Sequence, residues 1–178
     1  SRTQSDRLEG IFDAVIAGDF FSDWPGRDGV AEALQTRLGR ERDYEAKLDA
    51  ARRWCKEWHF RVGVHLLRGL SGPQEAARQY ADIAHAVLRV LWPLVTETFA
   101  GRHGPPPGRG AIVLGMGSLG AGALNAASDL DLIVIYDPLE VETSKGAKPL
   151  PARLYYARLT QALITALSAP TGEGMLYE

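Results

Sequence analysis

The chain has 178 residues, of which 46% are hydrophobic and 24% charged, and its net charge is −2. This composition is typical of a globular protein with one large domain or two small ones, and the charge excludes the broad basic surface of nucleic-acid-binding proteins. A single cysteine, Cys55, excludes an internal disulfide, and neither a signal peptide nor a membrane-spanning apolar run is visible. We therefore expect a cytoplasmic protein with no nucleic-acid or membrane partner.

Two long amphipathic helices are predicted in the first hundred residues. Residues 41–69 carry apolar side chains at steps of three and four, and residues 73–100 repeat the pattern. The charged residues of the first helix, Arg52 among them, are expected on its solvent side, whereas Cys55 is expected to be packed. The facing apolar stripes predict a helical layer.

The composition changes after residues 101–110, a segment rich in Gly and Pro that is unable to continue a helix. Three further elements are predicted: strands at 111–114 and 130–136, and a helix at 151–168. We divide the chain into a helical region at 1–104 and a second region at 105–178. Helices followed by strands predict an α+β fold.

A glycine turn between the two predicted strands has the clearest chemical meaning. Backbone N–H groups exposed in such a turn, ahead of a helix N-terminus, bind phosphate oxygens. We assign nucleotide binding to Gly115, Gly117, Ser118, Gly120 and Ser128.

Asp129 and Asp131 follow the turn, two residues apart on the second predicted strand. Side chains alternate along a strand, so both carboxylates are expected on one face, with Cα atoms roughly 7 Å apart. Two like charges on one face repel each other, and a divalent cation removes that conflict. Oxygen ligands together with triphosphate oxygens favour Mg²⁺ or Mn²⁺, so the pair is predicted to be catalytic and metal-binding, with ATP as substrate.

Two other interpretations of this stretch stay open. One is a solvated Asp-Leu-Asp beside an ordinary glycine turn. The other is a dinucleotide-binding fingerprint, because Gly115-x-Gly117-x-x-Gly120 follows a strand and Asp137 lies 22 residues after Gly115. Against the fingerprint stand the two carboxylates and an intervening helix that is short for a crossover between parallel strands.

The pattern apolar-Gly-Ser, ten residues, Asp-apolar-Asp-apolar resembles the signature of the DNA polymerase β-like nucleotidyltransferase superfamily. Residues 115–137 also resemble the core motif of the glutamine synthetase adenylyltransferase family, with further similarity at 60–64 and 174–178. The resemblance implies a truncated nucleotidyltransferase sheet and transfer of AMP from ATP to a tyrosine of glutamine synthetase, regulating nitrogen metabolism. It implies glutamine synthetase, the PII signal protein and ATP as partners.

The chain departs from the family pattern at Ser118, where a basic residue is usual, and at Ala123, where Glu is usual. The resemblance places a third metal-binding Asp two residues past Glu178. Residues 175–178 read like the opening of a strand, so the chain is expected to be an excised piece that is inactive alone.

The direction of AMP transfer has to be read from the flanks of the motif, because both domains of the family share it. Residues 174–178 resemble the adenylylating, C-terminal domain, as do residues 12–16 with the following Asp19-Phe20-Phe21. Three alternatives stay open: the adenylyl-removing half of the same enzyme, a pseudoenzyme that only binds nucleotide, and a docking module whose helices hold a partner.

Overall fold

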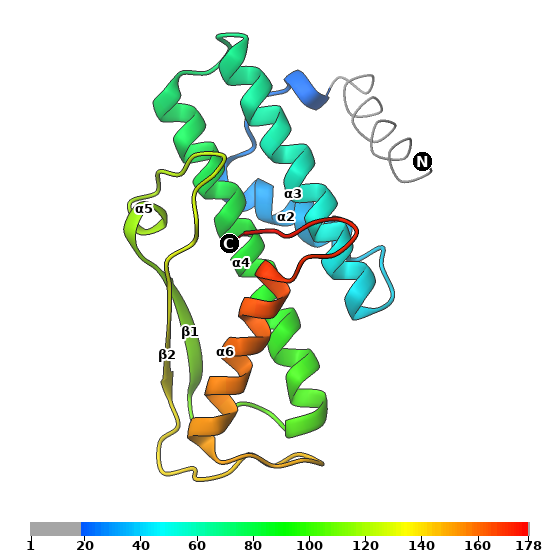
Figure 1. The fold of residues 1–178 in the computed structure, drawn as a ribbon, viewed down its shortest axis with the longest axis vertical. Coiled ribbons are helices and arrows are strands. Elements are labelled where there is room, and N and C mark those ends of the chain that lie inside the picture. The colour runs from blue at the N-terminus through cyan, green and yellow to red at the C-terminus, as the bar shows by residue number, and fades with distance from the viewer. Residues whose placement is uncertain (1–18, 178) are drawn as a thin grey trace.

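A computed structural model describes residues 19–177 of the chain. Its elements, in chain order, are η1 (Asp19–Phe21), α2 (Gly26–Leu38), α3 (Tyr44–Leu67), α4 (Pro73–His103), β1 (Gly110–Gly115), α5 (Gly117–Gly120), β2 (Leu132–Asp137) and α6 (Ala152–Ser168). In Figure 1 the long helices stand together and the β1–β2 hairpin lies beside α4 and α6. The predicted α+β class is confirmed: a helical layer carries a small antiparallel sheet.

The two long helices predicted from the apolar spacing are α3 and α4. The Asp43 side chain caps α3, accepting a hydrogen bond of 2.8 Å from the backbone N–H of Ala46. Pro73 occupies the first turn of α4, where the missing N–H costs nothing, and the helix continues through Pro93. By length and mean hydropathy α4 would suffice to cross a membrane, but its apolar stripe is packed against the other helices, as in a core helix.

A third helix of this layer, α2, was not predicted. Its buried residues are Val30, Ala31, Leu34 and Leu38, which recur at the spacing of a helix face. This apolar spacing is visible in the sequence and could have been used to predict the helix. Gly26 and Gly29 lower the helix propensity of the segment, so packing against α4 stabilises a helix that local preference alone does not favour.

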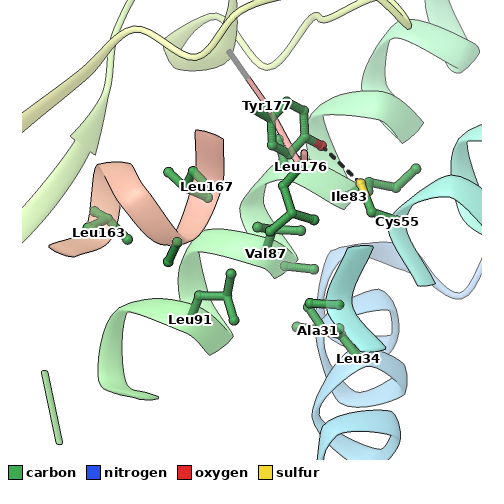
Figure 2. Close-up of a cluster of buried hydrophobic side chains, with 14 of the residues drawn as sticks. Ala31, Leu34, Cys55, Ile83, Val87, Leu91, Leu163, Leu167, Leu176 and Tyr177 are labelled. Atoms are coloured by element: carbon green, nitrogen blue, oxygen red, sulfur yellow. Dashed lines mark hydrogen bonds between the residues drawn. The ribbon is translucent and has the colours of Figure 1, made fainter. Parts of the chain in front are cut away.

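The hydrophobic core is centred on α4. Figure 2 shows Ile83, Val87 and Leu91 of α4 between Leu163 and Leu167 of α6 on one side and Ala31 and Leu34 of α2 on the other. All of these side chains are buried. Since the core includes residues from both sides of the predicted division at 104/105, the two regions share one core, and the division itself stays a prediction.

The sheet consists of β1 and β2, paired antiparallel from Gly110 opposite Asp137 to Gly115 opposite Leu132. Its inner face packs on the core through Ala111, Val113, Leu130 and Leu132. The antiparallel pairing contradicts the dinucleotide-binding interpretation, because that fold requires parallel strands joined by a crossover helix.

The sixth helix, α6, ties the hairpin to the helical layer. The Tyr155 hydroxyl donates a hydrogen bond of 2.8 Å to the Gly104 carbonyl, and the Tyr156 hydroxyl donates to the carbonyl of Pro107. The Tyr156 ring also stacks on Tyr136 of β2, with centroids 4.4 Å apart. The segment that leads into β1 and the end of β2 are thereby both attached to α6.

The C-terminal segment differs from the prediction. Residues 175–177 form no strand, and Glu178 lies outside the described residues. The backbone N–H groups of Leu176 and Tyr177 instead donate to the Leu167 carbonyl, at 2.9 and 3.2 Å. The buried Tyr177 hydroxyl lies 3.3 Å from His59 Nε2 and 3.8 Å from Cys55 Sγ (Figure 2). The C-terminal segment is thus held by the Leu167 carbonyl near the end of α6 and by the contacts of the Tyr177 hydroxyl, without a partner strand.

Two charged residues of α3, Arg52 and Arg61, are also misplaced by the prediction, because both are buried. Arg52 is only 2% exposed, although Cys55 on the same helix is buried as expected. The Arg52 guanidinium bonds to Asp49 at 2.9 Å and to the carbonyls of Ala166 and Ala169 at 3.4 Å. The C-terminal carbonyls of α6 carry negative partial charge, so they stabilise a buried cation there.

Candidate active site

The candidate site lies in the turn that connects β1 to β2. The backbone N–H of Met116 donates a hydrogen bond of 2.8 Å to the Asp131 carbonyl, which extends the strand ladder by one step. The chain then forms α5, a single turn whose Gly120 N–H donates to the Met116 carbonyl at 2.9 Å. The predicted order of strand, glycine turn and short helix is therefore confirmed, whereas the acidic pair predicted on the next strand lies just ahead of it.

Gly117 and Asp131 approach each other closely. The backbone of Gly117 has a φ of +51°, in the left-handed region that glycine adopts most readily. A Cβ at this position would lie 2.7 Å from Oδ2 of Asp131, which is too close for a side chain. The positive φ favours glycine here, and a side chain would force the exposed Asp131 carboxylate to shift.

Gly115 and Gly120 have a packing role within the turn. A Cβ on Gly115 would lie 2.7 Å from side-chain carbons of Leu119, and a Cβ on Gly120 would lie 2.8 Å from the Gly115 carbonyl oxygen. Leu119 is buried, so the two glycines let the turn fold back onto β1 around it. Contact between these glycines and phosphate stays a prediction.

Asp129 and Asp131 lie just ahead of β2, which begins at Leu132 rather than at residue 130. The extended alternation still holds, because both aspartates are exposed while Leu130 and Leu132 are half-buried against the core. Both carboxylates are therefore exposed in the segment that leads into β2, and their position on one face stays a prediction. Gly117 places the turn directly beside the second of them.

The loop that carries Asp129 is held by its own polar groups. The Ser128 hydroxyl accepts a hydrogen bond of 2.9 Å from the Asn125 N–H, and the Asn125 side chain accepts from the Ala127 N–H at 2.8 Å. Farther back, the N–H of buried Leu124 donates to the Ala77 carbonyl of α4 at 3.1 Å. Ser128 thus positions the aspartate loop, whereas its predicted contact with nucleotide has no test in this structure.

The charge environment of the pair suits a cation. Within residues 19–177, no ion pair engages Asp129 or Asp131, and no group of three His, Cys, Asp or Glu side chains is gathered at one place. Two exposed carboxylates of like charge therefore offer oxygen ligands without a protein counter-charge. Ser118 and Ala123, where the chain departs from the family pattern, are both exposed at the same turn.

A helical layer, an antiparallel hairpin and a carboxylate pair beside a glycine-serine turn together have the organisation of a nucleotidyltransferase. The sequence model of the glutamate-ammonia ligase adenylyltransferase family matches residues 4–178. The chain belongs to this family.

Curated relatives agree with the match. The chain is 41% identical over 169 residues to the bifunctional glutamine synthetase adenylyltransferase/adenylyl-removing enzyme of Mesorhizobium japonicum, covering 94% of this chain and 17% of that enzyme. It is 42% identical to the enzyme of the same name from Agrobacterium fabrum, with the same coverage. The corresponding Xanthobacter autotrophicus enzyme is 38% identical over 174 residues, 97% of this chain and 18% of the relative. The chain thus spans about a sixth of these relatives.

Proposed function

We propose that the chain is part of an enzyme that transfers AMP from ATP to a tyrosine of glutamine synthetase. The observation that carries the proposal is a pair of exposed carboxylates, Asp129 and Asp131, just ahead of β2, with Asp131 beside Gly117. Membership of the adenylyltransferase family supports the reaction class. The PII signal protein is proposed as a regulatory partner on the same family grounds.

In this proposal Asp129 and Asp131 hold Mg²⁺ or Mn²⁺, which fits their oxygen donors and the absence of a described counter-charge. When bound, a divalent cation neutralises triphosphate charge and favours departure of pyrophosphate. The turn at Gly117 and Ser118 orients the triphosphate, and the loop braced by Ser128 keeps Asp129 in place. The attacking hydroxyl belongs to the tyrosine of the acceptor protein.

We propose further that this part of the enzyme adds AMP rather than removes it. The support comes from residues 174–178 and from Asp19-Phe20-Phe21, which resemble the adenylylating domain. Residues 12–16, which also contribute to that comparison, lie outside the described residues. The carboxylate pair cannot discriminate, because attack by tyrosine on ATP and attack by phosphate on tyrosyl-AMP require the same charge stabilisation.

The decisive experiment is Asp131→Asn in the whole enzyme, with addition and phosphate-dependent removal of AMP assayed separately on glutamine synthetase. Adenylylation should fall by about 100-fold or more while removal persists, because a charge-stabilising group is lost at one site only. Asp137→Asn, at the far end of β2, is the matched control and should leave both activities unchanged. Loss of removal with retained addition would reverse the assignment, and loss of neither would refute the catalytic role of Asp131.

The 178-residue chain itself is proposed to be inactive. Two carboxylates alone position a divalent cation loosely, and loose positioning costs orders of magnitude in rate. Pyrophosphate release measured with ATP, Mg²⁺ and glutamine synthetase should be indistinguishable from background for this chain and robust for the whole enzyme. Multiple turnovers by the chain alone would contradict this part of the proposal.

A further inference from the structure

The outward face of the β1–β2 hairpin carries a row of aliphatic side chains exposed to solvent. Ile112 is 57% exposed, Leu114 40%, Ile133 45% and Ile135 50%. The strand register sets Ile112 opposite Ile135 and Leu114 opposite Ile133, so the four form one continuous patch, here called the outer sheet face.

The hairpin is therefore apolar on both sides. Its inner face, which includes Val113 and Leu132, already packs on the core. A sheet with one wet face alternates apolar and polar residues, whereas strands covered on both faces are continuously apolar, as 111–114 and 132–135 are. This pattern is typical of a sheet that is covered on both faces.

Charged side chains lie at the two ends of the outer sheet face. The alternation of exposed residues that includes Ile133 and Ile135 begins with Asp129 and Asp131 at one end. At the other end, Arg109 and Asp137 form an ion pair at 3.3 Å. A charged rim around an aliphatic centre is the arrangement found in buried interfaces, and here one part of the rim is the candidate active site.

The apolar area of the outer sheet face helps to distinguish between its possible occupants. Four half-exposed aliphatic side chains offer on the order of 300 Å², enough to mark an interaction site. A specific interface between separate proteins buries about 800 Å² on each partner, so this patch is too small for a stable dimer by itself. A segment of the same polypeptide needs no such area, because tethering holds it at a high effective concentration.

We propose that the outer sheet face is covered by an apolar segment of the enzyme's own polypeptide from outside these 178 residues. The relatives are about six times longer than the region they share with this chain, so such a segment is available in an enzyme of this family. The covering segment would border Asp129 and Asp131 and so form one wall of the candidate site. The inference rests on family membership and on the packing of the hairpin, not on the direction or existence of catalysis.

The test is thiol accessibility in two proteins, this chain and the whole enzyme. Ile112→Cys and Ile135→Cys place a thiol at the outer sheet face, and Arg42→Cys is the control at an exposed position before α3. Iodoacetamide labelling is followed by mass spectrometry of the relevant peptide, which separates the new thiol from Cys55. Both outer-face thiols should react about tenfold or more slowly in the whole enzyme than in this chain, while the control reacts alike in both.

Three results would overturn the inference. Equal labelling of the outer-face thiols in both proteins would mean that the face stays exposed. Protection in this chain alone, increasing with concentration together with a dimer in sedimentation, would make a second copy the occupant. Rapid labelling of the whole enzyme that slows only when glutamine synthetase is added would make the acceptor protein the occupant. None of these readouts requires activity, so they are independent of the proposed reaction.

Discussion

A carbon atom attached to Cα of Gly117 would lie 2.7 Å from Oδ2 of Asp131. The turn and the carboxylate therefore occupy adjoining space, so a larger residue at this position would have to displace the aspartate side chain, while the positive φ also favours glycine. This relationship links two residues that are 14 positions apart in the sequence.

We expect Gly117→Ala to displace the Asp131 carboxylate and weaken Mn²⁺ binding by about tenfold or more, as loss of a ligand-positioning contact does. Gly122→Ala is the matched control. Gly122 has a φ of +68° but no atom within 4 Å of its Cβ position. Both variants should lose about 1–2 kcal/mol of stability through left-handed strain. Calorimetric Mn²⁺ titration with ATP present, beside thermal unfolding, separates the effects, and equal affinities for the two variants would show that the contact is irrelevant.

Asp129→Ala and Asp131→Ala should each abolish measurable Mn²⁺ binding in the presence of ATP. Each change leaves a single carboxylate, and hard divalent cations require several oxygen ligands. Glu140→Ala, which removes an exposed carboxylate after β2, should bind as the unaltered chain does. The same titration applies to all three variants, and unaltered affinity in the aspartate variants would refute the metal assignment. Binding is expected to be weak even in the parent chain.

Arg52→Met should destabilise the chain by about 2–3 kcal/mol. The change preserves the apolar stem but removes the donors that satisfy the carbonyls of Ala166 and Ala169, and buried acceptors without donors are costly. Arg53→Met, which loses a partly exposed ion pair with Glu173, should cost no more than about 1 kcal/mol. Urea unfolding measures both free energies. Equal costs would indicate that burial of Arg52 contributes nothing specific.

The free energy of unfolding should depend on pH because of the buried His59. Burial lowers the pKa of His59 from 6.5 to about 4, so the folded protein keeps this imidazole neutral. The unfolded chain takes up a proton below pH 6.5 and the folded chain does not until about pH 4, so stability falls as the pH decreases between these values. The contribution is at most about 3 kcal/mol. His59→Gln should flatten that window in urea unfolding at several pH values, and an unchanged slope would exclude His59 as the cause.

The sequence predicts those parts of the fold that depend on local periodicity. The apolar spacing of α3 and α4 and the β-branched runs of β1 and β2 need no knowledge of neighbours. Helix α2 depends on tertiary packing, since its glycines oppose a helix that α4 stabilises. Arg52 is buried because its guanidinium meets the C-terminal end of α6. Local periodicity contains no information about that contact and places an arginine on the solvent side.

The candidate site divides in the same way. Residue spacing correctly predicts the alternation of exposed Asp129 and Asp131 with half-buried Leu130 and Leu132, because alternation is a property of any extended chain. The spacing does not distinguish Gly117, which lies beside a carboxylate, from Gly115, which accommodates Leu119, or from Gly120, which lies against the Gly115 carbonyl, since all three belong to one motif. Only the folded turn, with each neighbour in place, assigns these roles.

The hydrogen bond from the Leu124 N–H to the Ala77 carbonyl attaches the middle of the loop between α5 and β2 to the longest helix. A loop anchored at its centre behaves as two short spans, each with few accessible conformations. Ordering the aspartate segment around an incoming ligand therefore requires little loss of chain entropy, and more of the gross interaction energy remains as affinity. Because the loop is bonded to the first turns of α4, a shift of those turns would also move the loop that carries Asp129.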